Sequence, residues 1–138
     1  MKRKYCDSKS MVMKYLYDTY MLNNVDILNF EASKDNKVTY HHIIKVEDLN
    51  LLGFPTKKTI ENGIVLTRIA HSYLHLIDDY APDIFYHLNK IILLITKERR
   101  LPTIEERNLI EIFLEAFEYR MQEYYEINPL YLKRTFVS

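Results

Sequence analysis

Histidines are the residues whose type and spacing most clearly suggest chemistry in this chain. His71 and His75 are four residues apart, a spacing that would place both imidazoles on one face of a helix, close enough to bind one metal ion. His41 and His42 are adjacent in a segment with the composition of a strand, where neighbouring side chains point to opposite faces. One of this pair can bind the metal while the other contacts a water molecule on the far side of a substrate. The pattern predicts a metal centre with a separate basic imidazole.

Asn62 stands between the two histidine pairs and is followed by Gly63. An Asn-Gly dipeptide is typical of a tight turn, and the side-chain amide of Asn62 can hydrogen-bond across that turn to a neighbouring imidazole. By itself the dipeptide predicts only a turn. The fifth histidine, His87, lies beside the apolar stripe of an expected helix, and we leave it out of the site.

Three segments of the chain resemble the HNH, or ββα-metal, endonuclease superfamily. They are YHHII at Tyr40–Ile44, TIENG at Thr59–Gly63, and the pair His71 to His75. The resemblance covers Val38 to about Leu76, and its His-x-x-x-His ending looks most like the colicin-type DNases. The run TIENGIVLTRIAHSYLH, with RLPTIEERNLIEIFLEAFE downstream, also looks like small stand-alone HNH proteins of bacteria and their phages.

The resemblance implies a DNA-hydrolysing site. It assigns metal ligands to His41 and His71, and a third ligand to His75 as in the colicin type. It assigns the general base to His42 and the residue that holds this base to Asn62, with products that carry a 5′ phosphate and a 3′ hydroxyl. Phosphodiester hydrolysis needs an activated water in line with the leaving oxygen and a cation to neutralise the developing charge. A neutral imidazole near pH 7 is suited to the base.

The sequence departs from the family pattern in ways that leave the metal open among Mg, Mn, Ni and Zn. Many HNH proteins have Asp in place of His41, and an acid favours magnesium, whereas three imidazoles favour zinc, nickel, manganese or cobalt. The cysteine pairs that form a zinc knuckle in many relatives are absent, since Thr67 and Ala70 occupy the corresponding places. A longer loop, Glu47–Pro55, replaces the Gly-Gly often found after the base.

Charge gives only local support for DNA binding. The chain has 19 basic and 19 acidic residues, and its segment Val38–Tyr80 has four basic and five acidic residues. Candidate phosphate contacts are Lys57, Lys58 and Arg68. The usual behaviour of charge runs favours a solvated loop for the two lysines, with phosphate binding as the alternative. The alternative function is therefore a catalytically inactive HNH-like binding protein, encoded by a phage or mobile element, that modulates a host protein or nuclease.

The cysteine count and the hydropathy of the sequence indicate the cellular compartment. Cys6 is the only cysteine, which excludes an internal disulfide framework and a Cys-x-x-Cys redox motif. The longest apolar run, Ile91–Ile95, is far shorter than the roughly 20 residues that span a bilayer. The basic amino terminus is followed by no secretory h-region. We expect a cytoplasmic protein with no membrane partner.

The elements that must position these residues follow from apolar periodicity and turn signals. We expect a helix over 10–22, a loop with at most one strand over 23–37, strands at Val38–Ile44 and Ile64–Leu66, and a long exposed loop at Lys45–Glu61. Three helices should follow: one from the N-cap Thr67 through Tyr80, a second from Pro82 to about Lys97, and a third that opens with a capping box at Thr103 and Glu106.

The predicted fold class is α+β. A ββα-metal motif over 38–80 would pack with an N-terminal helix and with two C-terminal helices over 81–127, all in one HNH-like domain spanning residues 1–138. The stripes expected in the core are Ile84, Phe85, Leu88, Ile91, Ile92 and Ile95 in the first of these helices, and Leu109, Ile110, Phe113, Phe117, Met121 and Tyr124 in the second. Beyond Asn128 and Pro129 we expect a loosely held tail.

Overall fold

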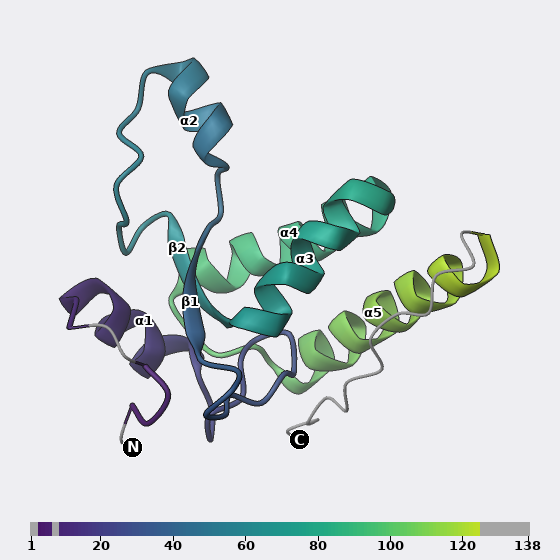
Figure 1. Ribbon diagram of the computed structural model, residues 1–138, viewed down its shortest axis with the longest axis horizontal. Coiled ribbons are helices and arrows are strands. Elements are labelled where there is room, and N and C mark those ends of the chain that lie inside the picture. Colours follow the sequence, from purple (N-terminus) through teal and green to yellow (C-terminus); the bar gives the residue numbers. More distant parts are fainter. Residues whose placement is uncertain (1–2, 7–8, 125–138) are drawn as a thin grey trace.

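A computed structural model describes residues 3–6 and 9–124 of the chain (Figure 1). Within them the chain forms five helices and a two-stranded sheet, in the order α1 (Met11–Tyr20), β1 (Val38–His42), α2 (Val46–Leu52), β2 (Gly63–Thr67), α3 (Arg68–Tyr80), α4 (Pro82–Glu98) and α5 (Ile104–Tyr124). The predicted α+β class is confirmed. The tail beyond Asn128 lies outside the described residues.

The two strands pair antiparallel, with a register that runs from Val38 opposite Thr67 to His42 opposite Gly63. β1 ends two residues earlier than predicted, because Asn62 changes the pairing at the end of the hairpin. The backbone carbonyl of Asn62 accepts from Ile43 N (3.0 Å), and its side-chain Oδ1 accepts from Ile44 N (2.8 Å). The Asn62 side chain thus accepts the hydrogen bond from Ile44 N that a backbone carbonyl would accept if the strand pairing continued.

The segment Lys45–Glu61 is not the continuous loop that the sequence predicts, since it contains α2. Glu47 and Asp48 lie in the first turn, where acidic side chains favour a helix, and Gly53 ends the helix with a left-handed φ of 74°. Only Leu49 is buried within this helix. The helix is only seven residues long and is followed at once by the turn residues Gly53 and Pro55, so the sequence favoured a loop. In Figure 1, α2 and the segment that returns to β2 extend away from the other helices as an arm.

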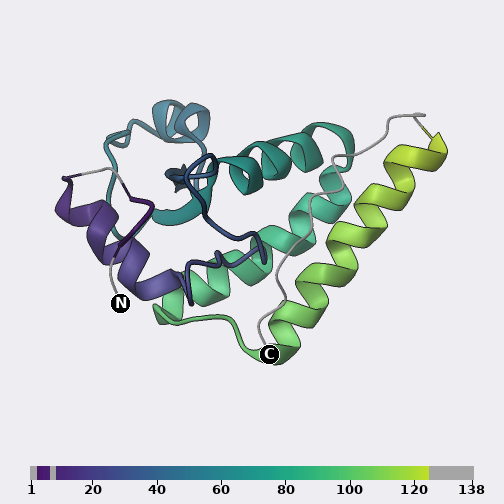
Figure 2. The same cartoon turned by 60° about the horizontal axis from the view of Figure 1, so that its bottom comes forward.

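The helices cover the sheet from two sides. α1 packs against β2, while α4 lies between α3 and α5 (Figure 2). The capping box of α5 is confirmed, because Glu106 N donates to Thr103 Oγ1 (3.1 Å) and Thr103 N donates to Glu106 Oε1 (2.8 Å). Ser10 is the N-cap of helix α1, and its side chain accepts from Met13 N.

The core stripes are narrower than predicted. In α4 the buried apolar residues are Ile84, Leu88, Ile92 and Ile95, with Phe85 and Ile91 only partly buried. In α5 the buried stripe is Ile110, Leu114, Phe117 and Met121. The predicted core positions Leu109 and Tyr124 are instead exposed, because the face of α5 that meets α4 is centred on Ile110 and Leu114.

A buried carboxylate ties the irregular segment before the sheet to the start of α3. Asp26 Oδ1 accepts from the backbone N–H groups of Leu28 (2.9 Å) and Phe30 (3.0 Å). Its Oδ2 accepts from both Thr67 N and Thr67 Oγ1 (2.9 Å each). Burial raises the pKa of Asp26 to about 6, and the four hydrogen bonds oppose that shift. Since Thr67 is also the N-cap of α3, Asp26 fixes where this helix begins.

We predict that Asp26→Asn lowers the free energy of unfolding at pH 8 by about 1–3 kcal/mol, because the amide NH2 would face a donor and leave it unsatisfied. Urea unfolding followed by circular dichroism measures the change. Asp35→Asn is the matched control at an exposed carboxylate, with an expected change of less than about 0.5 kcal/mol. An unaltered urea midpoint for Asp26→Asn would show that the network does not stabilise the fold.

Candidate metal centre

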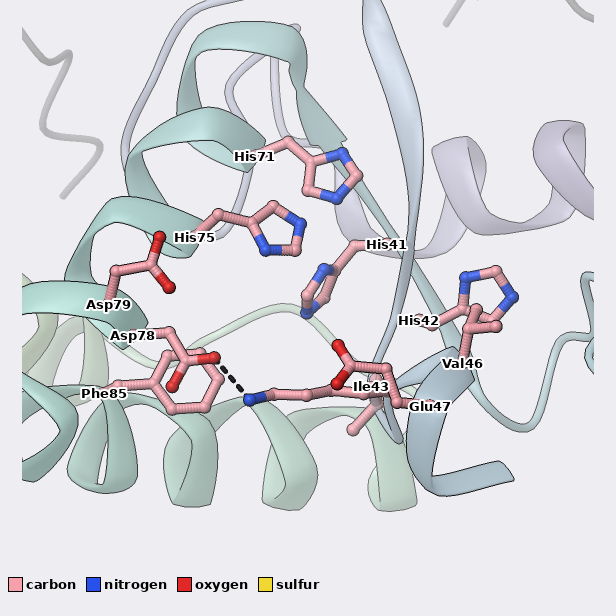
Figure 3. A pocket seen from close by; sticks show the side chains of 11 residues that line it. His41, His42, Ile43, Val46, Glu47, His71, His75, Asp78, Asp79 and Phe85 are labelled. Carbon is pink, nitrogen blue, oxygen red and sulfur yellow. Dashed lines mark ion pairs between the residues drawn. The ribbon is translucent and has the colours of Figure 1, made fainter. Parts of the chain in front are cut away.

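The structure brings together the three histidines that the sequence predicts as metal ligands. His41 comes from β1, and His71 and His75 come from consecutive turns of α3 (Figure 3). Their ring centroids lie 5.1 Å apart for His41 and His71, 6.0 Å for His41 and His75, and 4.8 Å for His71 and His75. Each ring offers one nitrogen, and these three nitrogens all lie within 4.8 Å of one another.

Local structure explains this convergence. α3 starts directly after β2, so His71 falls at the end of its first turn and His75 one turn later. β1 is paired with β2 along its length, and the alternation of side chains along it separates His41 from Tyr40 and His42. His41 turns toward α3, while the rings of Tyr40 and His42 contact each other edge to face with centroids 4.7 Å apart.

The imidazole of His41 is buried without a hydrogen-bond partner. The residue is 5% exposed, and neither ring nitrogen has a partner among the described residues. A buried polar group without a hydrogen-bond partner lowers the free energy of unfolding by about 1–3 kcal/mol. The position of the His41 ring therefore destabilises the metal-free fold. An orphaned imidazole beside two others is the environment that a metal ion would satisfy.

Burial also keeps two of the three rings, His41 and His71, uncharged. Desolvation lowers the pKa of His41 to about 3, with smaller contributions from His71, His75 and His42. Desolvation, followed by the nearby His75 and His42, lowers the pKa of His71 to about 4. Both rings are therefore neutral at pH 7, which is the form that binds metals.

The three nitrogens fit one divalent ion of the transition series. Nitrogens bound at about 2.0–2.1 Å around a tetrahedral ion lie about 3.4 Å apart, so small side-chain rotations would bring the set together. His75, the exposed member, has the freedom to make such a rotation. An all-imidazole set suits zinc, nickel or cobalt better than magnesium, which prefers oxygen ligands.

The histidines open into a cavity of about 530 Å³, part of whose lining is charged. Glu47 of α2 and Asp78 and Asp79 of α3 line it together with Lys45. Lys45 Nζ pairs with Asp78 Oδ2 at 2.5 Å, and this bond is the main cause that raises the pKa of Lys45. This ion pair, dashed in Figure 3, joins the residue that directly precedes α2 to α3. No sequence pattern indicated it, since two opposite charges far apart in the chain have no periodic signature.

His42 borders the same cavity from the other face of β1. Its Nε2 lies 3.1 Å from the carbonyl oxygen of Thr56, which can only accept, so Nε2 carries the hydrogen. Nδ1 is then the nitrogen with a free electron pair. The neighbouring ring of Tyr40 is fixed because its hydroxyl donates to Thr59 O (2.7 Å) and accepts from Thr59 N (2.9 Å). A Cβ atom at Gly63 would overlap this ring, which explains the glycine.

Asn62 lies beside the strand end that carries His42, but its amide bonds the backbone instead of an imidazole. Asn62 Oδ1 accepts from Ile44 N (2.8 Å), and Nδ2 donates to Ile44 O (3.2 Å). Both the oxygen and the nitrogen of the Asn62 side-chain amide are therefore hydrogen-bonded to the main chain of Ile44. Asn62 therefore holds the backbone of Ile43 and Ile44, directly after His42 in the chain.

The predicted phosphate contacts lie outside the lining of this cavity. Lys57 and Lys58 are exposed on the arm, with Lys58 Nζ 5.8 Å from the ring centroid of Tyr40. Arg68, at the start of α3, donates from Nη2 to the carbonyl oxygen of Asp35 (2.6 Å). His87, which we left out of the site, is exposed and stacks on Phe113 with centroids 5.4 Å apart.

Comparison with protein-family models, with curated proteins and with solved structures gives no match to this chain. Among the described residues, none of the helices combines the length and the apolar character needed to cross a membrane.

The lowered pKa of His41 predicts a pH-dependent stability of the metal-free protein. An unfolded imidazole takes up a proton below about pH 6.5, whereas folded His41 resists protonation until about pH 3. Stability is therefore full above pH 6.5 and falls as the pH is lowered. Between pH 7 and pH 5 we expect His41 to account for a loss of about 1–2 kcal/mol. Urea unfolding with a chelator present, in wild type and His41→Leu, measures it. A wild-type loss no larger than that of His41→Leu would contradict the prediction.

Proposed function

We propose that this protein is a metal-dependent endonuclease of the HNH type that hydrolyses DNA phosphodiester bonds. The observation that carries the proposal is the convergence of three imidazoles on one point, with a fourth, His42, bordering the same cavity from the opposite face of β1. The order of strand, strand and helix in β1, β2 and α3 is also that of a ββα-metal motif. The sequence resemblance supports the same function.

The residues that would hold the ion are His41, His71 and His75. When bound, a divalent ion supplies positive charge to the scissile phosphate and to the oxygen that leaves. His42 acts on the water: its Nε2–H is held by the Thr56 carbonyl, so Nδ1 can take the proton as the water oxygen bonds to phosphorus. The bond from phosphorus to the 3′ oxygen then breaks, and that oxygen is protonated from solvent. The products are a 5′ phosphate and a 3′ hydroxyl.

The charged residues around the cavity disfavour the binding of a phosphate. Glu47, Asp78 and Asp79 repel a phosphate, and Lys45 is already paired with Asp78. Only Lys57 and Lys58 are predicted contacts on the exposed arm. DNA binding by so few cations should be weak and strongly reduced by salt, so the assay must use low ionic strength.

A second candidate function is a catalytically inactive HNH-like protein that docks on a host protein or nuclease. One observation favours it: apolar side chains are exposed near the tip of the arm, with exposed fractions of 85% for Leu51, 65% for Leu52 and 58% for Phe54. Exposed apolar groups of this kind are common at protein interfaces. The zero net charge of the chain also suits a protein partner.

We predict that His42→Ala reduces plasmid nicking by at least about 100-fold, because the water loses its base. Metal-free protein is supplied with magnesium, manganese, nickel or zinc singly at low salt. His87→Ala, the matched control at an exposed histidine, should nick like wild type. Full activity of His42→Ala would contradict the assigned base. A wild-type protein that binds metal and nicks nothing would instead favour the binding protein.

A further inference from the structure

The hydroxyl of Thr39 lies between two groups that together fix its single hydrogen. Thr39 Oγ1 is 3.0 Å from the backbone carbonyl oxygen of Leu66 and 2.8 Å from Nδ1 of His71. A carbonyl oxygen can only accept, so the hydroxyl hydrogen goes to Leu66. The hydroxyl oxygen must then accept from His71, which requires a hydrogen on Nδ1.

This hydrogen bond determines which nitrogen of His71 is free. A neutral imidazole carries one hydrogen, so Nδ1–H leaves Nε2 with an exposed electron pair. In Figure 3 one ring nitrogen of His71 points toward the rings of His41 and His75. The nitrogen bonded to Thr39 lies on the β1 side of the ring, and Nε2 is therefore the nitrogen directed into the three-histidine cluster.

We propose that Thr39 is a positioning residue that holds His71 in the Nδ1–H tautomer before any metal arrives, so that Nε2 is prepared as the ligand atom. The inference rests on the metal site of the proposed function. Ligand histidines commonly donate their second nitrogen to an oxygen that fixes ring orientation and tautomer. Here that oxygen is a threonine hydroxyl with its own acceptor on the neighbouring strand.

The placement of Thr39 follows from the sheet. Thr39 and His41 are two residues apart on β1, so both face α3. Thr39 is paired with Leu66 in the register, which brings the Leu66 carbonyl within reach of its hydroxyl. Leu66 in turn precedes Thr67, the N-cap of the helix that carries His71. One strand therefore supplies one ligand and orients another.

The test is the tautomer of His71 in metal-free protein labelled with ¹⁵N at histidine, read from long-range ¹H–¹⁵N correlation spectra near neutral pH. We expect Nδ1 protonated and Nε2 unprotonated in wild type. Thr39→Val keeps the branched shape but removes the acceptor, so the Nε2–H form should appear and Zn²⁺ affinity should fall about 10–100-fold in calorimetry. Thr39→Ser should restore both. Thr19→Val is the matched control, because the Thr19 hydroxyl donates to its own helix at Tyr15 O.

A wild-type His71 with its hydrogen on Nε2 would overturn the proposal, and so would a Thr39→Val protein with unchanged tautomer and Zn²⁺ affinity. If Thr39→Val does not fold, the wild-type spectrum and the Thr39→Ser affinity decide. A wild type that binds no Zn²⁺ also overturns it, because Thr39 then prepares no ligand. A protein that shows the expected tautomer and Thr39-dependent Zn²⁺ binding, but cuts no DNA, would support this inference while contradicting the endonuclease.

Discussion

The candidate site depends on the register between β1 and β2. Val38 pairs with Thr67 and His42 with Gly63, and this pairing sets which face of β1 each histidine occupies. A slip of one residue would turn His41 away from α3 and point its neighbours at the helix instead. The alignment also places Thr39 beside the Leu66 carbonyl and Tyr40 over Gly63, where only a glycine leaves room for the ring. The three-histidine cluster, the Thr39 hydroxyl and His42 on the opposite face thus depend on the same register.

Two sets of hydrogen bonds, one at each end of the paired strands, fix the register of the hairpin and the position of α3. At the start of α3, Thr67 Oγ1 donates to the buried Asp26 and accepts from Ala70 N. These hydrogen bonds to a buried carboxylate join the segment before the sheet to the first turn of α3. At the other end of the hairpin, Asn62 closes the turn with both halves of its amide on Ile44. Packing of α4 against α3 and α5 supports the helix from behind.

The features that could be predicted from the sequence are those that depend on regular spacing or on residues close together in the chain. The spacing of His71 and His75 predicts a shared helix face, and Thr103 with Glu106 predicts the start of α5. Features that depend on long-range pairing had no such signal. Helix α2 buries a single residue, Leu49, and the Lys45–Asp78 ion pair joins segments that are distant in the sequence. Nothing in the sequence distinguished Thr39 from the other residues of its strand. The partner of Asn62 was mispredicted for the same reason, because the competing backbone groups of Ile44 become visible only in three dimensions.

We propose that His41, His71 and His75 bind one metal ion together. An X-ray absorption spectrum at the zinc edge, recorded on protein loaded with one equivalent of Zn²⁺, tests it most directly. The structure predicts three imidazole nitrogens at about 2.0–2.1 Å, with one fewer in His75→Ala and no change in His87→Ala. A first shell of oxygen atoms with at most one imidazole, or a shell unaltered by His75→Ala, would contradict the three-histidine centre.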